Sequence, residues 1–327
     1  MTWTGTRVLI TGAGGFIGSH LAERLVGLGA QVRALVHYNA LGSYGWLDTS
    51  PQQAQMEIVT GDITDTERLN DVMRGREIVF HLAALIAIPY SYQAPRSYVR
   101  TNIEGTLNVL NGVRNLGVQR MIHTSTSEVY GTAQYVPIDE VHPQQGQSPY
   151  AASKIGADKM VEAYSRSFEV PVVTVRPFNT FGPRQSTRAI IPSVITQCLT
   201  GSVVSLGNLH TTRDLNYVAN TVDGFIRAAE VPEAVGQTIN LGSGREIAIG
   251  DLVAMIVRLV GREVQVVSDA QRVRPVQSEV DRLLADATRA RTVLGWEPCV
   301  TLEDGVQRTI TWIAQHLERY RPDVFTL

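Results

Sequence analysis

Short hydrophobic runs alternate with segments of helical periodicity through the first half of the chain. Strands are predicted at 7–12, 32–36, 56–63, 77–83, 120–127 and 172–177. Apolar residues at helical spacing predict helices at 15–29, 65–75, 95–116 and 149–168. Strands that alternate with helices indicate parallel βαβ units with right-handed crossovers. We therefore predict an α/β fold built on a Rossmann-type, doubly wound parallel sheet.

The alternation becomes less regular after Pro177. Residues 179–193 have a loop-like composition. Further helices are predicted near 190–200, 217–230, 249–261, 286–294 and 302–319, and short strands near 203–206 and 238–241. This pattern predicts a Rossmann domain over 1–178 and a smaller C-terminal α/β lobe over 179–327.

Composition narrows the class of protein. The 327 residues are 44% hydrophobic, enough for a sizeable core, and the formal net charge of -2 gives no electrostatic reason to expect nucleic acid or a membrane surface. The two cysteines, Cys198 and Cys299, lie far apart and predict neither a disulfide framework nor a metal site. The longest apolar run, 78–88, is too short to span a bilayer, and no apolar signal core precedes the first strand. We expect a soluble cytoplasmic protein without a metal.

A glycine fingerprint lies between the first strand and the first helix. Gly12, Gly15 and Gly18 form G-x-x-G-x-x-G. Glycine permits a tight turn and close approach of the backbone to a pyrophosphate, and the helix N-terminus supplies N–H donors. Because the motif leaves a strand and enters a helix, we favour a dinucleotide site over an ordinary glycine-rich turn.

The choice between NAD and NADP stays open on the residues alone. The second strand ends at Val36 and His37, so no acidic residue is present to bind an adenosine ribose. No arginine follows the strand to bind a 2′-phosphate, and Arg33 lies near the start of the strand. Asp62, after the third strand, fits either an adenine contact or a turn or N-cap.

Two further motifs carry chemistry. Tyr150 and Lys154 stand at i and i+4, on one face of a helix. A lysine ammonium beside the phenol lowers its pKa, and a nicotinamide cation adds to this, so the phenolate can take a hydroxyl proton. Lys154 and Lys159 are the two lysines of an arginine-rich chain, which suggests a chemical need for lysine at one of them. Glu128, in TSTSEVYG, ends a predicted strand and is a candidate carboxylate base.

The chain resembles the extended short-chain dehydrogenase/reductase family, and specifically its nucleotide-sugar epimerases, dehydratases and decarboxylases. The segments that carry the resemblance are TGAGGFIG, HLAA, TSTSEVYG, SPYAASK, RPFNTFGPR and TRDLNYVANTVDG. Within that group LIAIPYSY, TSTSEVYGTAQYVPI and QGQSPYAASKIGAD look most like the NAD-dependent 4,6-dehydratases of the legionaminic-acid type, which act on an N-acetylated nucleotide hexose.

The resemblance implies a role for each matching position. The residues expected at the cofactor are Gly12, Gly15, Phe16, Ile17, Gly18, Asp62, Ile63, Leu82, Ala83, Ala84, Thr124, Tyr150, Lys154 and Pro177. The residues expected in catalysis are Thr126 on the sugar 4-hydroxyl, Ser127, Glu128, Tyr150 as the base, and Lys154 on the nicotinamide ribose. The residues expected at the substrate diphosphate are Asn179, Arg213 and Arg274, although an arginine is also common on a solvated face.

The resemblance also implies the cofactor and the partners. It implies tightly bound NAD that is recycled within each turnover, with NADP not excluded, and a nucleotide-sugar substrate, a UDP-sugar by preference. Residues 1–178 would hold NAD(P) and the catalytic groups, and residues 179–327 would mainly bind the nucleotide sugar. A homodimer is implied through the helices at 95–116 and 149–168, whose apolar residues are equally explained by core packing.

The Ser127–Glu128 pair leaves several reactions open. All these enzymes oxidise C4 of the sugar, after which Glu128 can remove the C5 proton and the 6-hydroxyl can leave as water. The best-known sugar dehydratases have Asp-Glu here, and serine is a poor acid. In a dehydratase Glu128 therefore performs both proton transfers. Decarboxylases of nucleotide uronic acids also show Ser-Glu, and a 4-epimerase ranks third because it gives Glu128 little to do. A non-catalytic NAD(P)-sensing protein ranks low, because Tyr150 and Lys154 are both present.

Overall fold

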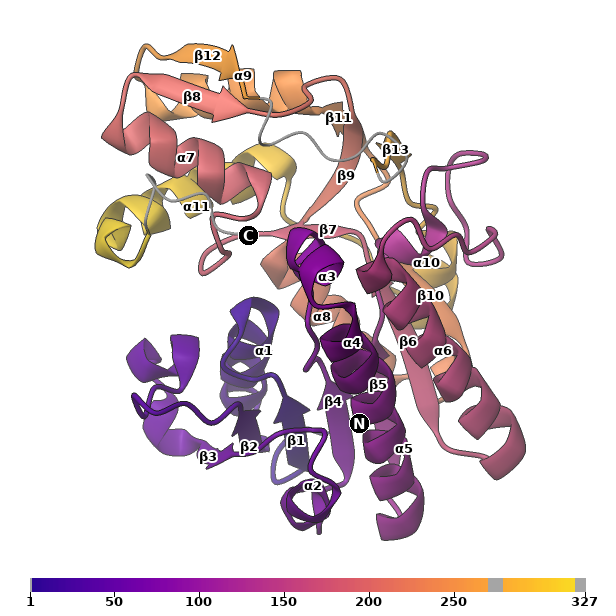
Figure 1. Cartoon of the computed structure of the whole chain (residues 1–327). Coiled ribbons are helices and arrows are strands. Elements are labelled where there is room, and N and C mark those ends of the chain that lie inside the picture. Colours follow the sequence, from indigo (N-terminus) through magenta and orange to yellow (C-terminus); the bar gives the residue numbers. More distant parts are fainter. Residues whose placement is uncertain (1, 270–278, 321–327) are drawn as a thin grey trace.

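A seven-stranded parallel sheet forms the lower half of the computed structural model, which describes residues 2–269 and 279–320 (Figure 1). The strand order is β10-β6-β5-β4-β1-β2-β3. The strands are β1 (Arg7–Thr11), β2 (Gln31–Val36), β3 (Glu57–Thr60), β4 (Ile78–His81), β5 (Arg120–Thr124), β6 (Val172–Pro177) and β10 (Thr238–Leu241). The order reverses between β1 and β4, as in a doubly wound fold, so the predicted fold class is confirmed.

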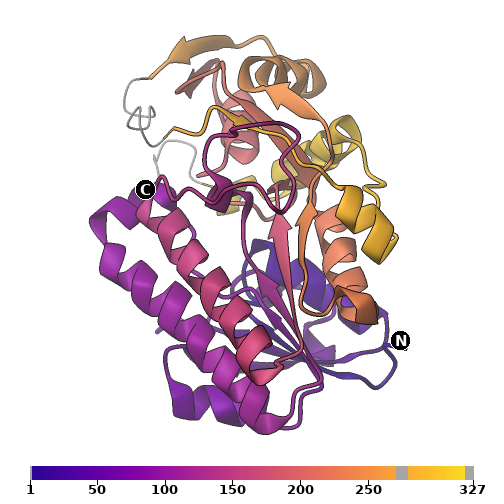
Figure 2. The ribbon, with the colours of Figure 1, turned by 90° about the vertical axis from the view of Figure 1, so that its right-hand side faces the viewer.

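Both faces of this sheet are buried, which explains the continuous apolar runs of its strands. In β1, Val8 and Ile10 join one hydrophobic cluster, and Leu9 joins the cluster on the other side. The helices that cover the first face are α1 (Phe16–Gly27) and α8 (Val218–Glu230). Those that cover the second are α2 (Thr66–Met73), α5 (Gly105–Leu116) and α6 (Pro149–Phe168), and α5 and α6 lie side by side (Figure 2).

A smaller lobe lies above the carboxyl ends of the strands (Figure 1). Its strands are β7 (Asn179–Phe181), β9 (Thr212–Tyr217), β11 (Glu246–Ala248) and β13 (Arg282–Leu283) in one sheet, with β8 (Val203–Leu206) and β12 (Gln265–Ser268) in another. Its helices are α7 (Ile190–Thr200), α9 (Ile249–Val260) and α11 (Leu302–Gln315). The helix α10 (Thr288–Leu294) packs against β10. Ligands of open parallel sheets bind at this carboxyl edge, so the lobe faces the expected site.

The chain returns to the large sheet after entering the lobe. Strand 238–241 was predicted in the lobe, and that prediction is wrong: it pairs in parallel with β6. Residues 179–181 were predicted as loop, but they form β7 and pair with β9. The strand β9 is rich in polar residues and gave no period-2 signal. Its Asp214 is buried and accepts the backbone N–H groups of Ser243, Gly244 and Ala285, contacts that only distant segments supply.

The helix predicted over 95–116 is interrupted. The structure has α3 (Ile88–Gln93), α4 (Pro95–Tyr98) and a π-helical turn at Val99–Glu104 before α5 begins. A π-turn inserts an extra residue per turn and is frequent at functional sites. Within the described ranges, no helix combines the length and hydropathy needed to cross a membrane.

Candidate active site

The turn between β1 and α1 depends on glycine at two positions. Gly12 has a φ of +72°, and a Cβ there would lie 2.8 Å from the backbone nitrogen of Ala83. A Cβ at Gly18 would lie 2.2 Å from the carbonyl oxygen of Gly12. Gly15 is the N-cap of α1, and Phe16 and Ile17 follow it. The result is a cradle of backbone at a helix N-terminus, which fits a pyrophosphate.

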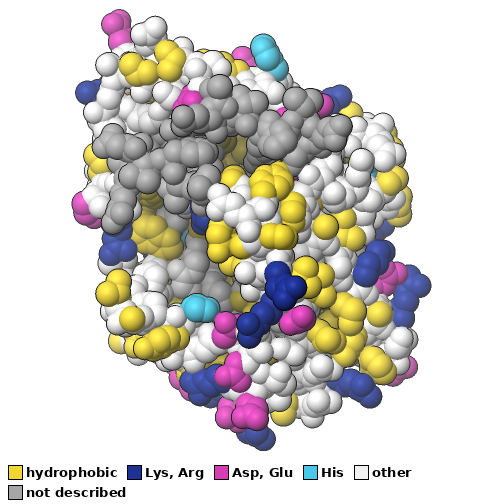
Figure 3. Space-filling view, viewed as in Figure 1, with side chains coloured by type: hydrophobic (Ala, Val, Ile, Leu, Met, Phe, Trp, Pro, Cys, Tyr) yellow, Lys and Arg dark blue, Asp and Glu magenta, His cyan; other side chains and the backbone are white. Residues whose placement is uncertain are grey.

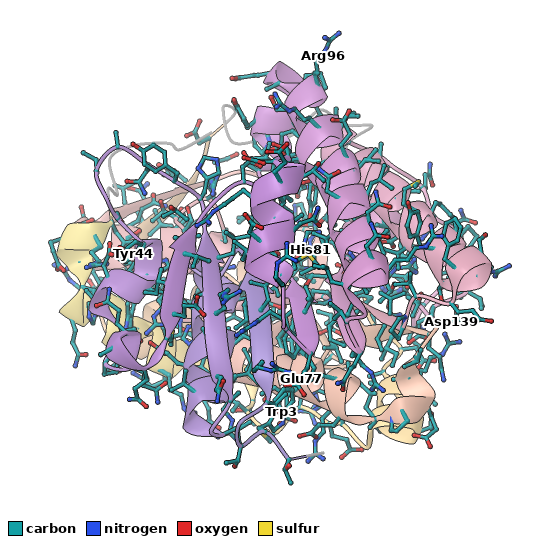
Figure 4. The ribbon with its side chains drawn as sticks, turned by 90° about the horizontal axis from the view of Figure 1, so that it is seen from below. Trp3, Tyr44, Glu77, His81, Arg96 and Asp139 are labelled. Carbon is teal, nitrogen blue, oxygen red and sulfur yellow. The ribbon has the colours of Figure 1, made fainter. Side chains whose placement is uncertain are left out.

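The neighbouring end of β4 is fixed by a buried hydroxyl. Thr11 Oγ1 accepts the N–H groups of Leu82 (3.2 Å) and Ala83 (3.1 Å) and therefore donates to Nδ1 of His81 (2.9 Å). His81 Nε2 then donates to Thr106 Oγ1 (3.1 Å). Burial holds the pKa of His81 well below its usual value, so the ring is neutral. Figure 4 shows His81 near the centre of the molecule. Leu82, Ala83 and the adjoining Ala84 therefore lie beside the glycine turn.

Beside the end of β2, Asp62 acts as a turn residue. Its Oδ1 accepts the backbone N–H (2.8 Å) and the hydroxyl (2.9 Å) of Thr64, and its Oδ2 lies 3.4 Å from His37 Nε2. Ile63 is buried against α5 and accepts a hydrogen bond from Asn108 through its carbonyl. Arg33 is held by Glu57 and by the carbonyl of Val72, so its guanidinium is engaged away from the end of β2.

Tyr150 and Lys154 meet the end of β5. Helix α6 begins with Ser148, whose hydroxyl accepts the Ala151 N–H (3.1 Å). Lys154 Nζ donates to the carbonyl oxygen of Thr124 (2.7 Å), and a hydrogen bond joins the hydroxyl groups of Tyr150 and Thr126. Tyr150 and Lys154 are both buried. The predicted pair therefore points into the sheet edge rather than to solvent.

Burial dominates the electrostatics of this pair. It lowers the pKa of Lys154 from 10.5 to about 8, while the charge of Asp158 acts to raise it. Burial also raises the pKa of Tyr150, and the charge of Glu128 adds to this effect. For the chain alone the pKa of the phenol is therefore raised, because desolvation outweighs the stabilising contacts, and the lowering predicted from the sequence also involves the nicotinamide cation.

Glu128 lies beside the phenol. Thr126 caps the short 3₁₀ helix Ser127–Tyr130 and accepts the Glu128 N–H through its hydroxyl (3.2 Å). Ser127 is buried, and Glu128 is half-buried. Since the charge of Glu128 raises the pKa of Tyr150, the carboxylate and the phenol share one site. A phenol and a carboxylate thus belong to one site at the end of β5.

Asn102 was missed by the sequence analysis. It lies in the π-helical turn, where its side chain brackets Leu85: Oδ1 accepts the Leu85 N–H (2.9 Å) and Nδ2 donates to the Leu85 carbonyl (3.0 Å). Nδ2 also donates to Ser153 Oγ on α6 (2.9 Å). Tyr98, just before the turn, packs edge-on against Tyr150 with ring centroids 6.3 Å apart. The sequence signal that could have found it is a polar amide, Asn102, within the helix predicted over 95–116.

The segment held by Asn102 continues into α3 at the face between the sheet and the lobe. Hydrophobic side chains gather there (Figure 3), and the exposed ones include Ile86, Tyr90 and Tyr92.

The predicted substrate residues lie on the lobe side of this edge. Asn179 is on β7 opposite Leu215 of β9, and Arg213 lies two residues before Leu215, so the three share one face of the sheet. Arg213 donates to the carbonyl of Thr212 (2.8 Å) and lies 3.4 Å from Glu279.

The remaining predicted residues are Pro177 and Thr124 at the ends of two strands of the large sheet, and Arg274. Pro177 ends β6. The side-chain amide nitrogen of Asn179 and the hydroxyl of Thr124 are buried without a hydrogen-bond partner among the described residues. Arg274 lies outside the described residues.

Comparison with known proteins shows the family. A model described as GDP-mannose 4,6 dehydratase matches residues 9–309. A UDP-glucose 4-epimerase from Mycolicibacterium smegmatis is 32% identical over 93% of this chain and 97% of its own. A dTDP-glucose 4,6-dehydratase from Streptomyces griseus is 32% identical over 97% of each chain. A UDP-glucuronic acid decarboxylase 1 from Xenopus tropicalis is 31% identical over 95% of this chain and 73% of that one.

Solved structures agree with these relatives. DesIV, a dTDP-glucose 4,6-dehydratase from Streptomyces venezuelae with NAD bound, superposes with a TM-score of 0.88 and 28% identity, covering 97% of this chain and 99% of that one. Epimerase Mth375 from Methanothermobacter thermautotrophicus gives 0.89 and 32%, covering 97% and 94%. The chain therefore belongs to the family of NAD-dependent nucleotide-sugar epimerases and dehydratases within the extended short-chain dehydrogenases/reductases, and NAD is its cofactor.

The glycine turn yields a first prediction. In Gly18→Ala the new Cβ meets the Gly12 carbonyl, so the backbone of the cradle must shift. We expect the dissociation constant for NAD, measured by calorimetry, to rise about tenfold or more. Gly27→Ala is the matched control on the same helix, because its Cβ meets only Gln52 Nε2 at 3.8 Å. Equal NAD affinity in the two variants would contradict the assignment of this turn.

The buried ammonium yields a second prediction. Because the folded chain lowers the pKa of Lys154 from 10.5 to about 8, the charged form opposes folding below pH 8. Lys154→Met should therefore abolish hydride transfer, and the difference in free energy of unfolding between variant and wild type should change in favour of the wild type, by on the order of 3 kcal/mol, as the pH rises from about 8 to 10.5. Denaturant titrations across this range can measure the change. A difference that stays constant between pH 7 and 10.5 would refute this.

Proposed function

We propose that this protein is an NAD-dependent nucleotide-sugar 4,6-dehydratase with a UDP-N-acetylglucosamine-like substrate. The observation that carries the proposal is the placement of Glu128 beside Tyr150 at the carboxyl edge of the sheet. One carboxylate and one phenol at the same site supply two separate bases, which C4 oxidation followed by elimination requires. The likeness of the segments around TSTSEVYG to legionaminic-acid-type dehydratases supports the substrate class.

The substrate would lie between the sheet edge and the lobe. Arg213 and Asn179 share a face of the lobe sheet and carry the donors that a diphosphate needs. Holding the diphosphate there would direct the sugar towards Thr126 and Tyr150.

The first step is oxidation at C4. NAD held at the turn of Gly12, Gly15 and Gly18 would supply hydride acceptance from C4 and hydride return to C6, and its positively charged nicotinamide ring would favour the phenolate. Thr126 holds the 4-hydroxyl, and Tyr150 takes its proton. Lys154 holds positive charge near the phenol. Since burial and the charge of Glu128 raise the pKa of Tyr150, the phenol would need this positive charge, together with that of the nicotinamide ring, to act as a base.

Elimination follows from the new ketone. The ketone acidifies the C5 proton, which Glu128 removes, and the C5–O bond remains intact while the C6–O bond breaks. Glu128 then delivers that proton to the departing 6-hydroxyl, so that one water leaves. When hydride returns to C6, C5 takes up the proton that Tyr150 removed from the 4-hydroxyl, so the product differs from the substrate by one water. Ser127 is buried beside it and can orient the leaving group but not readily protonate it.

Decarboxylation is the second candidate, because decarboxylases of the family also have Ser-Glu at this place and the pair alone does not separate the two reactions. With a nucleotide uronic acid, C4 oxidation gives a β-keto acid that loses carbon dioxide without a strong base. A relative named as a UDP-glucuronic acid decarboxylase is 31% identical. A 4-epimerase is third, because returning hydride to C4 leaves Glu128 without a role.

Incubation with candidate nucleotide sugars followed by mass spectrometry tests the proposal. Loss of one water from UDP-N-acetylglucosamine supports the dehydratase. Loss of carbon dioxide from UDP-glucuronate would contradict it, and an unchanged mass with inverted C4 would indicate epimerisation.

Glu128→Gln gives a third prediction. The variant keeps the size of the side chain but removes the base, so it should still oxidise C4 while dehydration slows by about 10²–10⁴-fold. Stopped-flow absorbance would show reduced nicotinamide accumulating, and mass spectrometry would show little water loss. Glu162→Gln is the matched control, because Glu162 is a partly exposed carboxylate on α6 that pairs with Lys159, and it should retain most of the activity. Dehydration by Glu128→Gln near the wild-type rate would show that Glu128 is not the base.

A further inference from the structure

A buried carboxylate lies one helical turn beyond Lys154. Asp158 is on α6, almost completely buried, and accepts hydrogen bonds from two strands. From β5, Ser125 Oγ donates at 2.8 Å and His123 Nε2 at 3.1 Å. From β6, Arg176 donates through Nη2 at 2.9 Å and Nε at 3.2 Å. Nothing in the proposed reaction uses this carboxylate directly.

The partners of Asp158 show that it is ionised. Burial opposes its charge, but the His123 hydrogen bond and the Arg176 and Lys154 charges lower its pKa to about 2. Burial lowers the pKa of His123, whose Nδ1 has no partner among the described residues, so the ring is a neutral donor through Nε2. The carboxylate thus pairs with the Arg176 guanidinium and, one turn along α6, interacts electrostatically with the Lys154 ammonium.

Other charged and titratable groups surround this cluster. Tyr150 precedes it on α6, His81 of β4 stacks on His123 with centroids 5.9 Å apart, and Tyr130 accepts a bond from Arg176 (2.9 Å). On the outer side is a cavity of about 700 Å³ whose charged lining residues besides Asp158 and Arg176 are Glu140, Lys159, Glu162, Arg166 and Arg289. Of these, Lys159 and Arg166 pair with Glu162, and Arg289 pairs with Glu140. The carboxylate whose charge raises the pKa of Lys154 is Asp158.

We propose that Asp158 is a positioning residue of this site: it keeps the Lys154 ammonium protonated and ties the end of β5 to α6 through Ser125 and His123. The second tie matters because β5 continues into Thr124 and Thr126, which contact Lys154 and Tyr150. The role in catalysis rests on the proposed use of Lys154, but the charge relation does not depend on any reaction.

The proposal predicts a direction for Lys154. An opposite charge nearby favours the charged form by about 1–3 pH units. In Asp158→Asn that charge is removed, so Lys154 should lose its proton at a lower pH than in the wild type. The alkaline limb of C4 oxidation should move towards acid with it, because the phenolate of Tyr150 needs a charged neighbour.

Lysine NMR tests this directly, because the chain has two lysines. Lys159 is exposed, and Lys159→Arg leaves Lys154 as the single labelled ammonium. In the NAD-bound Lys159→Arg background, Asp158→Asn should lower the titration midpoint of Lys154 by about one pH unit or more. Asp158→Glu should restore it largely, and Ser125→Ala should leave it near the wild-type value. An unchanged midpoint in folded Asp158→Asn would overturn the proposal.

A second variant covers the case in which Asp158→Asn does not fold. Asp158→Asn/Arg176→Gln removes both members of the buried Arg176–Asp158 ion pair, so the guanidinium is not left buried without its carboxylate. The Lys154 midpoint should fall in this variant too, and an unchanged midpoint would equally overturn the proposal. The titration of Lys154 is measured without a sugar substrate. Its result therefore tests the role of Asp158 independently of whether the enzyme is a dehydratase.

Discussion

The contact between the Lys154 ammonium and the Thr124 carbonyl joins helix α6 to the end of β5, and the site is organised around it. A charged group in a buried position is unfavourable unless several partners compensate it. Here the carbonyl, the neighbouring Asp158 and the hydrogen-bonded Thr126–Tyr150 pair all belong to the same two elements. The parallel sheet makes this possible, because it brings the carboxyl end of β5 and the first turns of α6 to one edge.

The residues at this edge fall into two groups: those proposed for C4 oxidation and the one proposed for the later proton transfer at C5. In the proposed mechanism Thr126, Tyr150 and Lys154 serve hydride removal from C4, the step that the three candidate reactions share. Glu128, two residues beyond Thr126, would add a second base. Its negative charge also works against ionisation of Tyr150, so the site combines two bases whose charges oppose each other. Such pairs of titratable groups with interacting charges are typical of sites that run acid and base steps in sequence.

Much of the molecule could be predicted from local pattern. The strands and helices of the first 178 residues follow from periodicity, and the glycine turn and the Tyr150–Lys154 pair follow from spacing. Features that depend on distant partners could not. The strand 238–241 carries no mark of which sheet it joins, and β9 is stabilised by N–H groups near residues 243 and 285. The π-turn contains Asn102, which bonds to Ser153 of α6, so it depends on the packing of α6 against this turn. The burial that raises the pKa of Tyr150 depends on the same packing.

The central claim is that hydride leaves C4 and returns to C6 after water is lost. To test this, the protein is incubated with a UDP-N-acetylglucosamine-like substrate that carries deuterium at C4, and the deuterium in the product is located by NMR and mass spectrometry. The account predicts a 4-keto product that has lost water and carries the deuterium in its C6 methyl group. Deuterium that returns to C4 in an epimer of unchanged mass would contradict the claim. So would a decarboxylated sugar with deuterium at C4, formed when the corresponding C4-deuterated uronic acid is supplied.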